Sequence, residues 1–346
     1  MFHRILSLLT ISFVTFSLSA AVVTTGNGKV CFQEQVPTVG CVSITFNKCM
    51  ANDLFTFSKV MLDSVLVNRT ESDNIGPFGL ETGWTGGNHL NHQQPSARTD
   101  SVTVWADGSL LSPDRPRTVV CRQLRVSVTN TLLLPADTVP FAVERIDYLV
   151  SGNSIEVTAH HRCVAPQAVL VDRYYGMQSM FIDETEMLTP GGAYAQWTPI
   201  DSVSEFSHAS APCFCTFVEH SARGYQACWL DPTFGLGNRH LVDADDVVFI
   251  GHSWGKSYHK TIGRKTLHPG GTTSWHGVYS WFRTPLVDRC RKKAGRFSYL
   301  GWLGGKAMVF TTDSKGRMTM KPASKYNLQH TFRRMTSRIL LVALLP

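Results

Sequence analysis

Residues 148–162 read YLVSGNSIEVTAHHR, and this stretch decides the fold class. Two runs rich in β-branched and aromatic residues, 148–150 and 155–159, flank the pair Gly152-Asn153. Such residues favour strands, and a Gly-Asn pair between two strands favours a tight turn. The stretch therefore predicts a β-hairpin.

The same pattern recurs along the chain. CVSITF (41–46), SVTVW (101–105) and LRVSV (124–128) are strand-like, Asp107-Gly108 follows SVTVW, and 313–316 separates AMVFTT from RMTM as a turn.

Few stretches have apolar residues at the three- and four-residue spacing of a helix. Residues 53–66 are the nearest candidate, and they suit strands equally well. Many strands without intervening helices predict an all-β protein with antiparallel sheets, packed as a β-sandwich or jelly roll.

The composition describes a globular chain with a basic balance. Of 346 residues, 43% are hydrophobic and 17% charged, and the net charge is +7. A positive surface attracts acidic polysaccharide, anionic membrane or nucleic acid, although a modest excess can also serve solubility alone. Much of the excess of Lys and Arg lies in 289–296 and 315–338, which predicts one local positive patch.

The N-terminus predicts export. Arg4 precedes an apolar run, 5–18, and Ser19-Ala20-Ala21 offers small residues for cleavage after Ala21. The run is shorter than the ~20 residues of a membrane-spanning helix, and the alternatives are a first core strand or an uncleaved anchor. We expect a signal peptide at 1–21 and a secreted or periplasmic β-sandwich domain at 22–346, with a soft boundary near 202–212.

The sequence does not identify a cofactor, and it predicts no metal site. The nine cysteines form loose groups (Cys31, Cys41 and Cys49; Cys213, Cys215 and Cys228) without the paired spacing of a zinc site. Disulfides fit an oxidising compartment, but their connectivity cannot be read from the sequence. Nucleotide-binding glycine loops and nucleic-acid modules are also missing, and export disfavours a nucleic-acid partner.

Residues 73–100, DNIGPFGLETGWTGGNHLNHQQPSARTD, form the most unusual segment. Its glycines let the backbone approach a ligand, and Trp84, Asn88, His89 and Arg98 could hold a carboxylate or sugar hydroxyls. The segment predicts a functional loop, and the alternative is a structural Ω-loop.

Alternation along 155–162 (IEVTAHHR) gives one wholly polar face. Glu156, Thr158, His160 and Arg162 share it, whereas His161 falls on the apolar side as a core histidine. The polar face fits either a sugar-binding sheet or an ordinary solvated surface.

Two aromatic segments offer further candidates. In 169–181 (VLVDRYYGMQSMF), Arg173 lies near Tyr175, which suits a phenol exchanging a proton beside an anion, or ordinary packing. In 275–281 (WHGVYSW), the side chains of Trp275, Tyr279 and Trp281 point the same way, as a stacking platform for sugar rings or as core.

Residues 251–255, GHSWG, match the G-x-S-x-G pattern of a nucleophilic serine. Ser253 would be the nucleophile, and Asp288 and His330 follow in the right order. The poor helix pattern of 256–263 and the missing βα alternation argue against that fold. As a strand and turn, the stretch instead offers Lys256, Tyr258 and His259 near a possible site.

The segments GPFGLETGWTGGNHLN, RYYGMQSMF and SWHGVYSW together resemble secreted bacterial β-sandwich proteins that process polysaccharides, including jelly-roll polysaccharide lyases. The resemblance covers about 73–282. It implies a class of protein and carries over no catalytic residue.

The leading hypothesis is a lyase that cleaves uronic-acid chains by β-elimination. Such chemistry needs a group that neutralises the uronate carboxylate, a base and an acid. Asn88, His89 and Arg98 could neutralise, His160 or Tyr175 could be base or acid, and Arg162 and Arg173 could hold substrate. The alternatives are a non-catalytic carbohydrate-binding protein that uses the Trp275 row, and an esterase that uses Ser253.

Overall fold

The computed structural model describes residues 20–70, 73–135, 137–188, 196–200, 205–206, 216–234, 248–251, 256–290, 295–312 and 318–325. Within these ranges the chain forms antiparallel strands, one 3-10 turn (Ala323–Lys325) and no α-helix. The described part therefore contains no helix that could cross a membrane. This confirms the all-β prediction.

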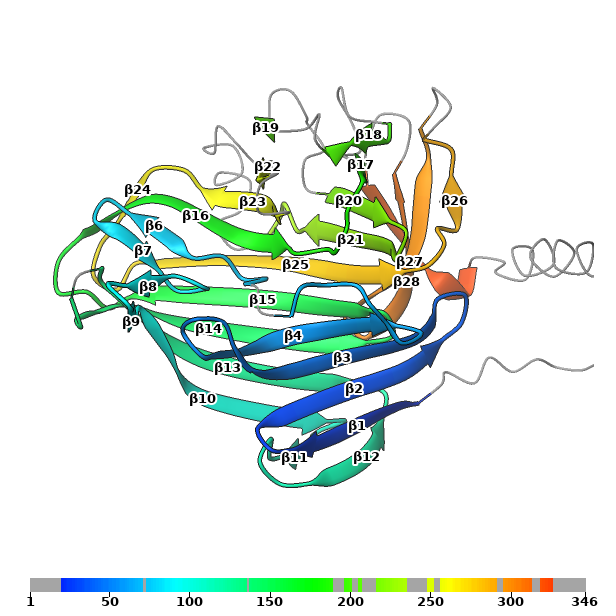
Figure 1. Ribbon diagram of the computed structural model, residues 1–346, viewed down its shortest axis with the longest axis horizontal. Coiled ribbons are helices and arrows are strands. Elements are labelled where there is room, and N and C mark those ends of the chain that lie inside the picture. The colour runs from blue at the N-terminus through cyan, green and yellow to red at the C-terminus, as the bar shows by residue number, and fades with distance from the viewer. Residues whose placement is uncertain are drawn as a thin grey trace, which may run out of the picture.

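The largest sheet has ten strands (Figure 1). In spatial order they are β11 (Ser109–Leu111), β10 (Ala97–Ala106), β13 (Leu124–Leu133), β14 (Pro140–Ser151), β15 (Ser154–Cys163), β25 (Thr272–Phe282), β21 (Gly224–Leu230), β20 (Thr216–Ser221), β17 (Glu186–Leu188) and β18 (Thr198–Pro199).

Two smaller sheets pair the remaining early and middle strands. A six-stranded sheet runs β12 (Arg117–Cys121), β1 (Ala21–Gly26), β2 (Lys29–Val36), β3 (Gly40–Cys49), β4 (Leu54–Leu62) and β5 (Val65–Leu66). A seven-stranded sheet runs β19 (Glu205–Phe206), β22 (Val248–Gly251), β23 (Lys256–Ile262), β16 (Val169–Ser179), β6 (Phe78–Leu80) and β7 (Gly83–Thr85), and β24 (Lys265–Leu267) also pairs with β16.

Two further sheets are local. The four-stranded sheet consists of β26 (Val287–Asp288), β27 (Phe297–Leu303), β28 (Lys306–Thr312) and β29 (Met318–Pro322). The two-stranded sheet consists of β8 (Leu90–Asn91) and β9 (Gln94–Pro95).

The core lies between the ten-stranded sheet and the two smaller sheets, which cover the same face of it. Phe57 of β4 packs edge-on against Tyr148 of β14 and Tyr279 of β25. The buried Tyr174 of β16 reaches the same face and hydrogen-bonds to His161 of β15. We call this the inner face. In Figure 1 the strands β1 to β4 pass in front of the large sheet.

The four-stranded sheet packs on the opposite, outer face at one end. Phe282 of β25 stacks on Tyr299 of β27 with 5.1 Å between ring centroids, and Trp229 lies 6.2 Å from Phe310. The rest of the outer face carries the polar alternates of β13, β14 and β15. Antiparallel sheets packed in this way confirm the predicted β-sandwich, while a jelly-roll connection stays a prediction.

The predicted hairpins are present. β14 and β15 pair from Ala142↔Cys163 to Ser151↔Ser154 around the Gly152-Asn153 turn. β10 and β11 close around Asp107-Gly108, and β28 pairs with β29 across 313–316. The ambiguous stretch 53–66 forms β4 and β5. Strand propensity and turn chemistry agree locally at each place, which explains why the prediction held.

Other predictions concern residues at or beyond the edges of the described ranges. β1 already begins at Ala21, so a cut after Ala21 would fall one residue inside this strand. The soft boundary 202–212, apart from β19, lies outside the described residues, as does most of 315–338. Seven cysteines are described, and no disulfide joins any two of them.

Candidate functional site

The GGNH turn of the glycine-rich segment is fastened by one buried asparagine. Asn52, in the turn between β3 and β4, donates through Nδ2 to the carbonyl oxygens of Gly87 and His89, at 2.9 Å each. Its Oδ1 accepts from the backbone N–H of Ser96 at 2.8 Å. Asn52 is 4% exposed, so these bonds compete little with water. The six-stranded sheet therefore fixes where His89 stands.

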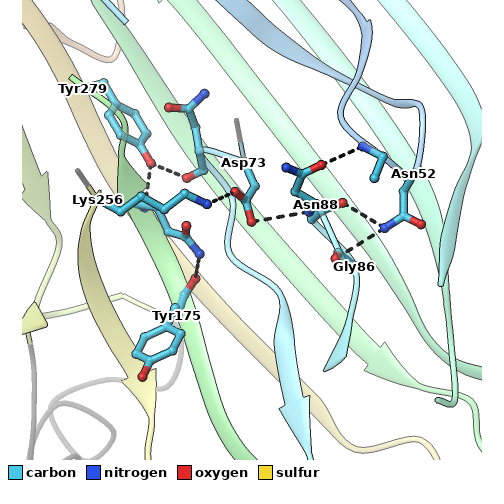
Figure 2. A network of polar contacts seen from close by, with 11 residues as sticks. Asn52, Asp73, Gly86, Asn88, Tyr175, Lys256 and Tyr279 are labelled. Carbon is cyan, nitrogen blue, oxygen red and sulfur yellow. Dashed lines mark hydrogen bonds and ion pairs between the residues drawn. The ribbon is translucent and has the colours of Figure 1, made fainter. Parts of the chain in front are cut away.

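A buried ion pair lies beside this turn. Asp73 is fully buried, and its Oδ1 accepts from Lys256 Nζ at 2.5 Å (Figure 2). Its Oδ2 accepts from the backbone N–H of Asn88 at 3.4 Å. Gly87 has φ +51°, and a Cβ there would lie 2.7 Å from Asp73 Oδ2. Glycine is therefore required where the turn wraps the carboxylate.

Four rings form a continuous run over the seven-stranded sheet, which we call the aromatic cluster: Trp84, His89, Tyr175 and Tyr258. The indole of Trp84 lies nearly parallel to the rings of His89 (5.1 Å, 20°) and Tyr175 (6.0 Å, 14°). Tyr175 lies 4.8 Å from Tyr258. All four side chains are partly exposed.

The sheet geometry explains this run. Trp84 stands opposite Gly79 in the β6–β7 pair, and Gly79 stands opposite Arg173 of β16. A Cβ on Gly79 would lie 2.9 Å from Arg173 Cγ and 3.1 Å from Trp84, so glycine makes room for both side chains. Tyr258 alternates with buried neighbours along β23, so it lies with Lys256 on the more exposed face of the seven-stranded sheet.

Charges surround the cluster on two sides. Arg173 is exposed, forms an ion pair with Asp172 at 2.7 Å and lies near the phenol of Tyr175. The Lys256–Asp73 pair supplies the second cation and a carboxylate. A guanidinium and an ammonium therefore flank the cluster, each held in place by its own aspartate.

Burial and nearby charges shift the pKa values of His89 and Tyr258 in opposite directions. Burial lowers the pKa of His89, and nearby Lys256 adds to this, while Asp73 acts in the opposite direction. The imidazole is therefore neutral at pH 7 and able to accept a proton. Burial raises the pKa of Tyr258, with Asp73 and Tyr175 adding to it, so this phenol keeps its proton. A neutral base and a protonated acid in one cluster suit proton-transfer chemistry.

The predicted site residues fall into three groups, two on opposite sides of the sandwich and one in its core. Trp84, Asn88, His89, Arg173 and Tyr175 gather at the aromatic cluster. Asn88 is exposed, and its Oδ1 accepts from the backbone N–H of Ala51 at 2.7 Å.

Three predicted residues, Arg98, His160 and Arg162, are exposed on the outer face of the ten-stranded sheet. His160 alternates with His161, which is 2% exposed and points to the inner face. β16 covers that inner face with Tyr174, and the neighbouring Tyr175 belongs to the cluster beyond it. A single catalytic site that contains both His160 and Tyr175 is therefore wrong.

The proposed stacking platform in 275–281 is also wrong, and its core alternative is correct. Trp275, Tyr279 and Trp281 do share a face, but they are 3%, 0% and 0% exposed. The reason is that β4 and β16 cover this face. Trp275 donates through Nε1 to the Tyr174 hydroxyl at 2.9 Å, and Phe57 packs 6.0 Å from Trp281.

The serine motif cannot be placed in full. Ser253 and His330 lie outside the described residues, and Asp288 accepts from Trp197 Nε1 at 3.1 Å. In the described ranges no group of three or more His, Cys, Asp or Glu side chains could hold a metal ion.

Sequence reasoning missed the roles of Asn52 and Asp73. Asn52 lies in a short turn with no distinguishing pattern. Asp73 begins the glycine-rich segment, so its place there was the available signal. Lys256 and Tyr258 were noted as near a possible site, and their alternation along a strand was the clue.

No protein-family model matches the chain, and no curated protein matches it. Among solved structures, a GH36 α-galactosidase from Geobacillus stearothermophilus is similar with a TM-score of 0.45 and 9% identity, over 75% of this chain and 40% of its own. An α-galactosidase from Lactobacillus brevis gives 0.42 and 8% over the same shares.

A putative aldose 1-epimerase from Klebsiella pneumoniae gives a TM-score of 0.33 and 8% identity, over 74% of this chain and 80% of its own. All three names refer to proteins that act on sugars, and none is a polysaccharide lyase. The chain spans about two fifths of the length of the two α-galactosidases. These similarities do not assign it to a family.

Proposed function

We propose that the protein binds polysaccharide on the aromatic cluster and cleaves uronic-acid chains there by β-elimination. The observation that carries this is the partly exposed run of His89, Trp84, Tyr175 and Tyr258 beside Arg173. The electron-rich face of an aromatic ring packs well on the C–H face of a sugar ring, and a guanidinium matches a carboxylate.

The residues at the cluster can be given roles in that reaction. Arg173 would bind the uronate carboxylate and lower the cost of removing the adjacent α-proton. His89, neutral at pH 7, would take that proton as the C–O bond to the leaving sugar breaks and a C=C bond forms. The Tyr258 hydroxyl would give its proton to the leaving oxygen, and Tyr175 is the alternative donor.

Non-catalytic binding is the second candidate, and one observation favours it. Both cations of the cluster already have a carboxylate partner, Arg173 with Asp172 and Lys256 with Asp73. A neutral saccharide could stack on Trp84 without any proton transfer. In that case Trp84 would be essential and His89 would contribute only to packing.

The test is to incubate purified protein with a panel of uronic-acid polysaccharides and follow the ultraviolet absorbance of the unsaturated product. We expect absorbance to rise, and His89→Asn to reduce the rate at least 100-fold, the usual size of a general-base contribution. His92→Asn is the matched control, because His92 is an exposed histidine of the same segment.

The pH profile sharpens the assignment. A base must be deprotonated, so the rate should fall only as pH drops below 6.5, the ordinary value for histidine, because the pKa of His89 is lowered. A flat absorbance trace across the panel, combined with binding that Trp84→Ala abolishes, would replace the lyase by the binding protein.

The partner and location follow from the same proposal. A protein that cleaves an acidic polysaccharide would act outside the cytoplasm, in agreement with the export predicted from the N-terminal segment. Fractionation of cells that express the full chain tests this location.

A further inference from the structure

The outer face of the ten-stranded sheet carries a regular polar surface far from the aromatic cluster. Strand register aligns its side chains in rows across the strands. One row includes Arg98, Thr131 and Arg162, since Thr131 pairs with Arg98 on one side and with Val143 on the other, and Val143 pairs with Arg162. The next row includes Thr129, Arg145 and His160.

These two rows carry a positive excess. They contain three arginines (Arg98, Arg145 and Arg162) and one aspartate, Asp100, at a bulge in β10. Arg98 forms an ion pair with Asp100 at 3.0 Å, and Arg145 does so with Asp147 of the adjoining row at 3.1 Å. In the described part of the chain no ion pair includes Arg162, which is exposed.

An aromatic ring stands beside the arginines. Phe234 lies 6.0 Å from the ring of His160 and 5.4 Å from that of His276, and it is only partly buried. The residues before it are anchored, because Asp231 Oδ2 binds His276 Nδ1 at 3.0 Å and Asp231 Oδ1 accepts from Thr233. A phenyl ring held over a polar sheet face offers an apolar surface for a ligand to cover.

We propose that this outer-face patch (Arg98, Arg145, His160, Arg162 and Phe234) is a second binding surface, which holds an anionic polysaccharide chain. Phe234 packs on a sugar ring, and Arg162 binds a carboxylate of the chain. Arg98 and Arg145 add positive charge along the rows, and His160 adds a hydrogen-bond donor. Binding there is separate from turnover, since the aromatic cluster lies on the other side of the sandwich.

The experiment uses the full-length protein with His89→Asn, so that the probe is not degraded. The probe is polygalacturonate, with neutral dextran as the uncharged comparison, and affinity electrophoresis measures the dissociation constant. We expect Arg162→Gln and Phe234→Ala each to weaken polygalacturonate binding about fivefold to tenfold, as the loss of one charge-assisted or stacking contact implies.

The matched control is Arg117→Gln, which removes the same charge from an exposed position of β12 in the six-stranded sheet. It should leave affinity unchanged. High salt should weaken binding of the parent protein and reduce the difference that Arg162→Gln makes.

The outcomes separate this inference from the proposed function. If Arg162→Gln and Phe234→Ala bind as tightly as Arg117→Gln while Trp84→Ala abolishes binding, the outer-face patch is not a site and the aromatic cluster stands alone. If the patch variants lose affinity while no uronic-acid polymer is cleaved by the parent sequence, the patch stands and the lyase fails. Equal dissociation constants for dextran and polygalacturonate would overturn the proposal that the ligand must be anionic.

Discussion

The two outer surfaces of the sandwich are built in opposite ways. The aromatic cluster depends on buried contacts between distant segments, such as Asp73 with Lys256 and Asn52 with the GGNH turn. The outer-face patch depends mainly on strand alternation, which stands its arginines and His160 in solvent on a regular ladder, while Phe234 alone is positioned by the contacts of Asp231. A substitution near the first surface should therefore disturb both structure and chemistry, whereas one on the second should change only what the surface binds.

The largest effect should come from Asp73→Asn. This change leaves the ammonium of Lys256, whose side chain is 15% exposed, without its carboxylate. Breaking a buried ion pair by removing one partner costs about 3 kcal/mol or more. We expect the free energy of unfolding, measured by urea denaturation, to fall by that amount, and any turnover to be lost because the turn that carries His89 loosens.

The double variant Asp73→Asn/Lys256→Met controls for the stranded charge. It should recover most of the lost stability, since it removes the buried ammonium and leaves a neutral pair of similar volume. Turnover should not recover, because the GGNH turn still lacks the carboxylate that holds Asn88. If Asp73→Asn alone is as stable as the parent, the buried network does not support the cluster.

The same contrast explains what the sequence could predict. Alternation in 155–162 correctly placed His160 and Arg162 on a polar face and His161 in the core, because strand periodicity is a local property. The cluster brings together Asn52, Asp73 and Lys256, and only the pairing of strands remote in sequence reveals that proximity. The error over Trp275 and Trp281 has the same origin: alternation shows that residues share a face, but not whether another sheet covers it.

An effect that is no larger, and acts on stability alone, concerns His276. Its imidazole lies between Asp231 (3.0 Å) and Glu156 (2.9 Å). Burial lowers its pKa, but the two carboxylates outweigh this and raise the pKa to about 9. The raised value stabilises the fold fully below pH ~6.5, and this stabilisation is lost as pH rises through about 9. The loss should amount to about 3 kcal/mol.

Urea denaturation between pH 6 and 10 measures this loss. His276→Gln should be less stable than the parent at pH 6, and the two should converge near pH 10. Glu156 also accepts from the backbone N–H of Gly304, at the turn between β27 and β28, so the bridge ties the four-stranded sheet to the large sheet. If the difference in stability between the parent and His276→Gln does not change with pH, the charged bridge is contradicted.

The smallest change in stability should come from Arg98→Gln on the outer-face patch. The Arg98–Asp100 pair is close, at 3.0 Å, but the side chains are 59% and 34% exposed, so water and salt screen it. Asp100 keeps a second contact, because its Oδ2 accepts from Thr131 Oγ1 at 2.6 Å. The free energy of unfolding should therefore change by less than about 0.5 kcal/mol, at low and at high salt. A loss well above 1 kcal/mol would show that the patch is coupled to the fold as tightly as the aromatic cluster. The contrast between a cluster fixed by burial and a patch fixed by alternation would then be wrong.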